Sequence, residues 1–252
     1  MRRAISVLVI LCLAGAAAEA RLRRHRATSG LSARRRAFTS PLITDPGSLD
    51  LEFAGLYAVN RSYWGPATLK YTPRAWRTEF SAGADFVASA ADDEQDRDTH
   101  FSDHVNLAAT TAFRAGERFS WAVAPMAVLF LRGESGARLG GALFARYDRD
   151  PHTLSSFASW SGATRASPAN PGGTFDLNFG YSRRFTRGWT VYSNIQWERS
   201  TGAAGFASLF EGVEYEVNDR LAFDLSAAHY SLRNAVDHQV AFGFTYTLAR
   251  AR

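Results

Sequence analysis

Cysteine is almost absent from this 252-residue chain, and its one cysteine lies in a segment that we expect to be removed. Cys12 falls within the apolar run 4–18, which follows two arginines and ends at the small-residue site 18–20. This pattern is typical of a cleaved secretory signal, and the run is short for a membrane helix; a retained N-terminal anchor is the alternative. Leu11 stands where a lipoprotein would have a small residue. The mature chain is therefore expected to contain no thiol and no disulfide.

A basic surface is missing from the main part of the chain. The net charge is +5, but residues 21–37 hold seven arginines and no acid, and the residues after them carry a slight excess of acids. A nucleic-acid-binding domain needs a basic face on its folded part, so the sequence excludes that class. We expect residues 21–40 to form a disordered, solvated tail, with contact to peptidoglycan or anionic lipid headgroups as the alternative.

Long apolar runs are absent after the signal, which excludes helical membrane spans. Residues alternate instead. Phe175, Leu177 and Phe179 fall on one face of an extended segment, while Asp176 and Asn178 fall on the other. A period of two predicts β-strands with one apolar and one polar face. We expect about twelve such strands, near 48–60, 64–73, 75–89, 101–114, 118–132, 136–148, 152–162, 173–184, 188–200, 204–217, 221–232 and 236–248.

The predicted connections alternate in length. One set is tight, at 72–74, 115–117, 148–151, 186–188 and 218–220. The other set is mostly longer, at 90–100, 163–172, 201–203 and 233–236. Short turns at one end and longer loops at the other are typical of outer-membrane barrels. The sequence therefore predicts an all-β fold, an antiparallel transmembrane β-barrel of about 12 strands with both termini periplasmic; ten or fourteen strands are the alternatives.

Aromatic residues tend to fall near the ends of the predicted strands, as Trp64, Trp189 and Tyr246 do. Amphipathic rings form such girdles at the two interfaces of a membrane. The alternative is that aromatic residues simply favour strands. We favour the girdle interpretation.

A closed barrel satisfies the backbone hydrogen bonds that lipid cannot, and its polar strand faces then line a lumen. Charges of both signs fall on these faces. They either pair and plug the lumen or line a narrow wet path, and the sequence does not decide between the two. The candidate lumen-lining residues are Asp50, Glu52, Lys70, Arg77, Glu79, Asp85, Arg138, Arg146, Asp176, Glu198, Glu214, Glu216 and Asp224.

The stretch 41–52, which reads PLITDPGSLDLE, resembles the N-terminal motif of an outer-membrane family named for the meta-pathway of phenol degradation. Similar patterns occur at 69–71, 217–221 and 237–246, so the resemblance extends over most of the predicted barrel. It implies a barrel that passes small or aromatic compounds and has no catalytic residues. The chain departs from the usual barrel ending, because the residues 249–252 follow the last predicted strand and make the insertion signal imperfect.

We therefore expect a signal peptide at 1–20 that is cleaved after Ala20, a tail at 21–40 and a barrel at 41–252. The expected function is passive transport of small solutes, including hydrophobic or aromatic ones, across the bacterial outer membrane. A structural or adhesion barrel without transport is an alternative. The expected partners are outer-membrane lipid, lipopolysaccharide, the barrel assembly machinery and a small solute, with no cofactor and no nucleic acid.

One pair of residues suggests an enzyme. His229 and Ser231 resemble the His-x-Ser pair of outer-membrane lipid A deacylases, in which the histidine activates the serine for acyl transfer. A third group should orient the histidine, but no acid falls on the positions expected beside the pair. We therefore favour a polar interface pair without catalysis. The neighbouring positions are Ala207, Leu209, Val236 and His238.

No metal site is predicted. The loop 92–98 is acidic, but it lacks the central glycine and the distal glutamate of a helical calcium loop, so a solvated loop is the favoured interpretation. His104, His152, His229 and His238 are scattered, without the spacing of a metal motif.

Overall fold

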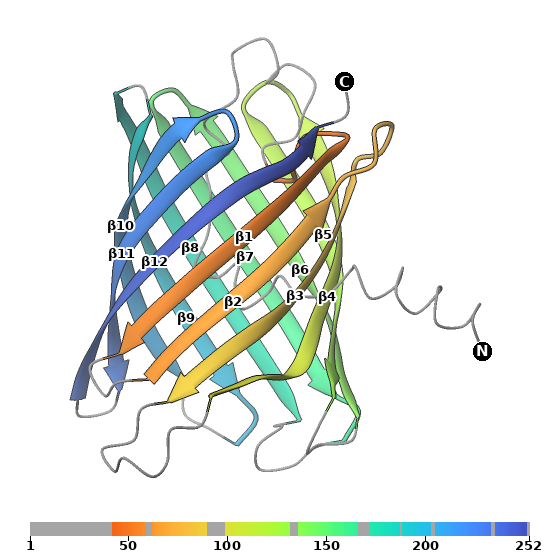
Figure 1. The fold of residues 1–252 in the computed structure, drawn as a ribbon, viewed down its shortest axis with the longest axis vertical. Helices are drawn as coiled ribbons and strands as arrows, with labels where there is room; N and C mark the ends of the chain where they lie inside the picture. Colours follow the sequence, from red (N-terminus) through yellow and green to blue (C-terminus); the bar gives the residue numbers. More distant parts are fainter. Residues whose placement is uncertain are drawn as a thin grey trace.

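The computed structural model describes residues 42–58, 62–89, 99–131, 136–165, 172–186, 188–202, 205–232 and 235–250. They form twelve strands that close into one antiparallel barrel (Figure 1). The predicted fold and strand number are confirmed. The strands are β1 (Ser48–Ala58), β2 (Ser62–Tyr71), β3 (Thr78–Ser89), β4 (Thr99–Ala115), β5 (Phe119–Phe130), β6 (Ala137–Arg149), β7 (His152–Ala163), β8 (Gly173–Thr186), β9 (Trp189–Ser200), β10 (Phe206–Asn218), β11 (Leu221–Leu232) and β12 (Ala235–Arg250).

The predicted signal peptide, the basic tail and the acidic loop lie outside the described residues. Among the described residues, none forms a helix with the length and apolar composition that a membrane-spanning helix needs.

Each strand pairs with its neighbours in sequence, and β1 pairs with β12 to close the barrel. The first residue of β1, Ser48, lies opposite the last residue of β12, Arg250. The first and last strands therefore begin and end at the same end of the barrel, at the top of Figure 1. The side of a membrane on which this end lies stays a prediction.

Four connections at this end are tight, at 116–118, 150–151, 187–188 and 219–220. The connections at the opposite end include the longer 90–98, 131–136, 164–172 and 201–205. The predicted asymmetry of the turns is thus confirmed. We call the end with the tight turns and the strand termini the short-turn end, and the other the long-loop end.

Strand boundaries differ from the prediction by up to three residues, and two of these differences have a clear physical cause. Residues 75–77 were expected in a strand, but β3 begins at Thr78, because Pro73 begins a turn in which the Trp76 amide donates to the Pro73 carbonyl at 3.1 Å. The last strand continues past the predicted end at residue 248. Arg250 still pairs with Ser48, and its guanidinium donates to the Asp219 carbonyl.

The side chains alternate between the two faces of the wall. In β8, Asp176 and Asn178 are buried inside the barrel, while Phe175 and Phe179 are exposed on its outside. The same alternation holds in β9, where Asn194 is buried. A strand with period-two burial in a closed sheet has one face turned to the lumen and one to the surroundings.

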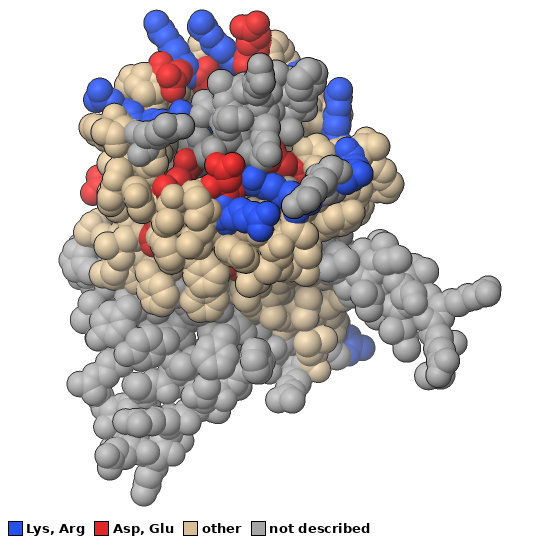
Figure 2. Space-filling model, turned by 45° about the horizontal axis from the view of Figure 1, so that its top comes forward, with Lys and Arg blue, Asp and Glu red and all other residues tan. Residues whose placement is uncertain are grey.

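The outer face carries aromatic side chains near both ends of the strands, as predicted. Those at the short-turn end are Tyr71, Trp76, Phe119, Tyr147, Tyr181, Trp189, Tyr215 and Tyr246, and those at the long-loop end include Trp160, Phe175 and Trp197. Aliphatic and phenylalanine side chains occupy most of the outer face between them. Exposed Glu211, which pairs with Ser193, interrupts this apolar belt. Charged side chains gather at the short-turn end (Figure 2).

Pro125 interrupts the backbone ladder between β4 and β5. Pairing between β4 and β5 passes from Ala108–Met126 to Thr111–Val123, and Pro125 lies in the gap. Proline has no amide proton to donate, which explains the missing rung.

On the outer face, a hollow of about 380 Å³ lies over Pro125 and Gly141 and is bordered by Leu143, Trp160 and Phe175, among others.

Adjacent glycines in β6 provide a test of how closely β6 and β7 approach. A Cβ atom on Gly140 would lie 2.1 Å from the backbone oxygen of Trp160, whereas a Cβ atom on Gly141 would lie 3.7 Å from its nearest neighbour, the Ala124 oxygen. We expect Gly140→Ala to lower the free energy of unfolding by about 1–3 kcal/mol through overpacking. Gly141→Ala, the matched control, should change it by less than about 0.5 kcal/mol. Urea unfolding in detergent micelles, followed by tryptophan fluorescence, measures both; equal losses would contradict the predicted backbone approach.

Candidate functional site in the barrel lumen

The lumen has two walls of different chemistry. The inward faces of β4 to β7 share a buried apolar cluster, with buried polar residues between and beyond its members. We call this cluster the apolar wall: Ala108, Ala112, Ala122, Ala124, Ala142, Phe144 and Phe157. Phe144 and Phe157 lie with their ring centroids 4.9 Å apart. Burial of these side chains against one another removes their apolar surface from water.

The remaining strands present buried polar side chains to the lumen. We call this set the polar wall: Ser48, Glu52, Thr68, Glu79, Ser81, Asp176, Asn178, Ser182, Thr190, Asn194, Gln196, Ser208, Glu214 and Thr247. Buried polar groups are stable only when they find hydrogen-bond partners or water. The lumen is therefore amphipathic across its width.

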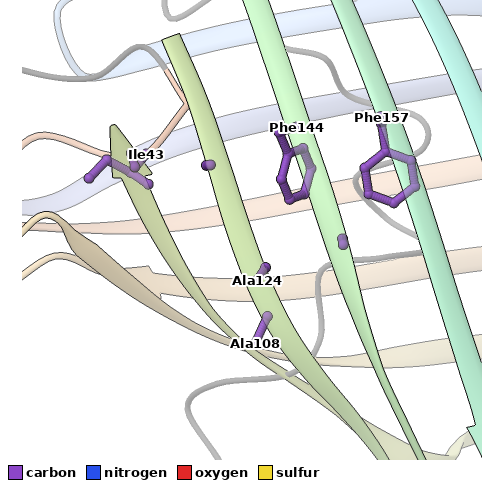
Figure 3. Packing of buried hydrophobic residues seen from close by; sticks show 8 residues of the cluster. Ile43, Ala108, Ala124, Phe144 and Phe157 are labelled. Atoms are coloured by element: carbon purple, nitrogen blue, oxygen red, sulfur yellow. The ribbon is translucent and has the colours of Figure 1, made fainter. Parts of the chain in front are cut away.

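The residues immediately before β1 enter the lumen at the short-turn end. Ile43 is 5% exposed and belongs to the same buried cluster as the apolar wall, with Leu42 packed against it. Ile43 lies near Ala108, Ala124 and Phe144 (Figure 3). We call residues 42–45 the entry segment, because they occupy the lumen beside the start of the first strand.

Hydrogen bonds to the polar wall hold the entry segment. The Thr44 amide donates to Glu79 Oε2 at 2.8 Å, and the hydroxyl groups of Thr44 and Thr72 lie 2.8 Å apart. The Gly47 amide donates to the Thr72 carbonyl at 2.6 Å. The segment therefore bridges the two walls, with Ile43 on the apolar side and Thr44 on the polar side, and it narrows the short-turn end.

Several predicted lumen residues lie inside the barrel. Glu52, Glu79, Arg146, Asp176 and Glu214 are buried there. Asp50, Lys70, Arg138, Glu198, Glu216 and Asp224 are partly buried and lie on the inward face of their strands.

The predicted charges form local pairs with neighbouring strands. Lys70 Nζ lies 2.6 Å from Glu52 Oε1, between the adjacent strands β1 and β2. Nearer the short-turn end of β6, Arg146 Nη2 lies 2.7 Å from Asp148 Oδ1, which also accepts the Thr153 hydroxyl at 2.7 Å. These pairs follow the wall, and the distances place each within one strand or between neighbouring strands.

At the long-loop end, Arg138 joins three strands. Its Nη2 donates to Thr174 Oγ1 at 2.6 Å and to Ser161 Oγ at 3.1 Å. Thr174 in turn lies 3.2 Å from Ser200 Oγ on β9. Arg138 thus places a guanidinium near one mouth of the lumen and ties β6 to β7 and β8.

Two of the predicted lumen residues, Arg77 and Asp85, are not among those found inside the barrel. Arg77 lies in the connection between β2 and β3 and is exposed at the short-turn end. Asp85 belongs to β3, but its side chain lies outside the described ones. A role for either in lining the lumen stays a prediction.

The candidate deacylase pair lies on β11. His229 pairs with Leu209 and His238, and Ser231 pairs with Ala207 and Val236. The predicted neighbours of the pair are therefore confirmed, and none of these four positions carries an acid. Among the described residues, no group of three histidine, cysteine, aspartate or glutamate side chains is arranged to hold a metal ion.

Sequence reasoning missed the apolar wall and the entry segment. A signal for the apolar wall was present in β5, where Ala122 and Ala124 occupy inward positions and Trp121 and Val123 occupy outward ones, so both faces are apolar. The sequence offered the entry segment only as part of a family motif, because four residues outside any strand show no periodicity.

No protein-family model matches the chain, and no curated protein sequence matches it. Solved structures do match. The KdgM porin in complex with disordered oligogalacturonate is 11% identical, with a TM-score of 0.58 over 80% of this chain and 99% of that chain. An outer membrane channel from Pseudomonas putida F1 is 7% identical, with a TM-score of 0.63 over 81% and 97%. The CymD monoaromatic hydrocarbon channel is 10% identical, with a TM-score of 0.53 over 96% and 99%. This chain therefore has the barrel fold of these proteins.

The position of the entry segment predicts the reactivity of a cysteine placed in it. In a chain carrying Cys12→Ser, we expect Ile43→Cys to react with a maleimide at least about tenfold more slowly in the folded barrel than in urea, because the side chain is buried against the apolar wall. Trp76→Cys is the matched control, since Trp76 is 53% exposed at the same end. Equal reactivity of the two cysteines in the folded barrel would show that the segment does not occupy the lumen.

Proposed function

We propose that this protein is a passive channel of the bacterial outer membrane that passes small solutes, including ones with a hydrophobic or aromatic part. The observation that carries the proposal is a closed barrel with an apolar outer belt between aromatic residues and a polar inner wall. Closure supplies every strand with two partners, as lipid requires, and polar inward faces need a lumen. A soluble barrel gains nothing from so extensive an apolar exterior.

The amphipathic lumen supports the proposed solutes. A small ring can contact Phe144 and Phe157 on one side while its polar substituents face the polar wall on the other. Among the structures with this fold, one is described as a monoaromatic hydrocarbon channel and another is a porin in complex with an oligogalacturonate. We also propose membership of the family named for the meta-pathway of phenol degradation, on the resemblance at 41–52.

Export and membrane location are part of the proposal. The signal at 1–20 would direct the chain across the inner membrane, with cleavage after Ala20, and lipopolysaccharide and the assembly machinery would be its partners there. Sequencing the N-terminus of protein from fractionated host membranes tests this. Protein that keeps residues 1–20 or fractionates with the inner membrane would argue against it.

The decisive experiment is single-channel recording of the purified protein in a planar bilayer, after a heat-modifiable band on a gel has established that the barrel is folded. Discrete current steps are the expected result. A folded barrel that stays silent would overturn the channel proposal and favour a structural or adhesion role.

The ion pair on the polar wall predicts how selectivity responds to mutation. Lys70→Met removes the cation beside Glu52 and should raise the cation-to-anion permeability ratio by about twofold or more, while Glu52→Gln should lower it. The reversal potential in a salt gradient measures both changes. Arg183→Met is the control, because Arg183 lies on the outer face, 4.9 Å from the Phe185 ring centroid. Unchanged selectivity in both lumen variants would exclude an ion path past this pair.

A further inference from the structure

Three basic side chains form a row across the outer face at the short-turn end. Arg149 of β6 lies opposite His152 of β7, which lies opposite Arg183 of β8. All three side chains are exposed. Adjacent strands are about 4.8 Å apart, so the row is roughly 10 Å long. On β9 the register continues with Val191, so the positive charge is confined to β6, β7 and β8. We call these three residues the basic row.

The carboxylates on either side of Arg149 lie beside other cations. Asp148 Oδ1 lies 2.7 Å from Arg146 Nη2, and Asp150 Oδ1 lies 3.7 Å from Arg184 Nη1. Arg146 and Arg184 both belong to the inward faces of their strands. No carboxylate among the described residues forms an ion pair with either arginine of the basic row. The row therefore keeps its positive charge for an anion that comes from outside the chain.

Aromatic contacts position two members of the basic row. Arg183 Cζ lies 4.9 Å from the ring centroid of Phe185, which is two residues nearer the short-turn end of β8. A contact with a ring face uses none of the five N–H donors of a guanidinium, so these donors stay available. His152 Nδ1 lies 2.8 Å from the Tyr181 hydroxyl, and the two rings stack. The row is thus supported by aromatic side chains that do not neutralise it.

A second row lies one step deeper into the apolar belt. Tyr147 of β6, Leu154 of β7 and Tyr181 of β8 are paired in register, and all three are exposed on the outer face. Tyrosine favours the level at which lipid headgroups meet hydrocarbon. From the short-turn end inward, the surface therefore presents cations, then phenol groups, then apolar side chains. The parts of a phospholipid follow the same order: phosphate, glycerol esters and acyl chains.

We propose that the basic row binds the phosphate group of an anionic phospholipid in the leaflet at the short-turn end. The inference rests on the proposed location in the outer membrane, where the periplasmic leaflet contains phospholipid and the short-turn end is predicted to face the periplasm. Arginine binds phosphate through paired N–H groups, and each arginine near an anionic surface adds to the attraction. His152 lies between the two arginines and adds a ring nitrogen to the site.

Native mass spectrometry of the detergent-folded protein, titrated with dioleoyl phosphatidylglycerol or dioleoyl phosphatidylcholine, tests the site. We expect phosphatidylglycerol to bind about fivefold or more tightly than phosphatidylcholine. Replacing both Arg149→Gln and Arg183→Gln should weaken phosphatidylglycerol binding about tenfold or more and leave phosphatidylcholine binding unchanged. Arg199→Gln is the matched control, because Arg199 is exposed on the outer face of β9 near the long-loop end; it should change the affinity by less than about twofold.

A single variant keeps the test informative if the double variant does not fold: Arg149→Gln should weaken phosphatidylglycerol binding about threefold or more. Equal binding of the two lipids, or an equal loss in Arg199→Gln, would overturn the site. Row variants that lose binding of lipid A but keep that of phosphatidylglycerol would overturn it too. Current recordings on the same preparation separate the two proposals. A conducting barrel without lipid preference sinks the site alone, whereas a silent barrel that binds phosphatidylglycerol through the row sinks the channel alone.

Discussion

The structure depends on the pairing of β1 with β12. Every other strand finds both partners among its neighbours in the sequence, and only this pair joins the two ends of the barrel chain. Without it, two strands would keep a row of unpaired amides and carbonyls, which neither lipid nor an apolar exterior tolerates. Its register runs from Ser48–Arg250 to Ala58–Gln239. This register also sets the tilt of the strands against the barrel axis, and the tilt in turn sets the width of the lumen.

Closure has a second effect, because it brings chemically different strands to face each other. The apolar cluster of β4 to β7 and the buried polar residues of the other strands come from separate stretches of sequence, yet they form different sides of one lumen. The entry segment uses this contrast, with Ile43 on one side and Thr44 on the other. The amphipathic lumen is thus a property of the closed barrel, and no single strand has it.

Much of this architecture was predictable from local pattern. The alternation from Phe175 to Phe179 predicted both the strand and the face that it turns to the lumen. The lengths of the connections predicted that the short turns share one end of the barrel. The inward positions of Glu52, Glu79 and Asp176 followed from the same period of two. Pattern could not give what depends on distant partners, such as the contact of Ile43 with the apolar wall or the hydrogen bond from the Thr44 amide to Glu79.

The predicted strand ends were wrong where local chemistry overrode the period-two alternation of the sequence. Pro73 starts a turn that delays β3 to Thr78, and Arg250 extends β12 because Ser48 is there to pair with it. The second case needs knowledge of the partner strand, which alternation within one segment does not contain.

The entry segment is joined to β1 through only Pro46 and Gly47. So short a tether keeps the effective concentration of the entry segment in the lumen on the order of millimolar or higher, as expected for short linkers. A dilute solute does not outcompete such an occupant. Any passage that requires the segment to leave is therefore limited by its rate of departure, and raising the external solute concentration does not accelerate that step.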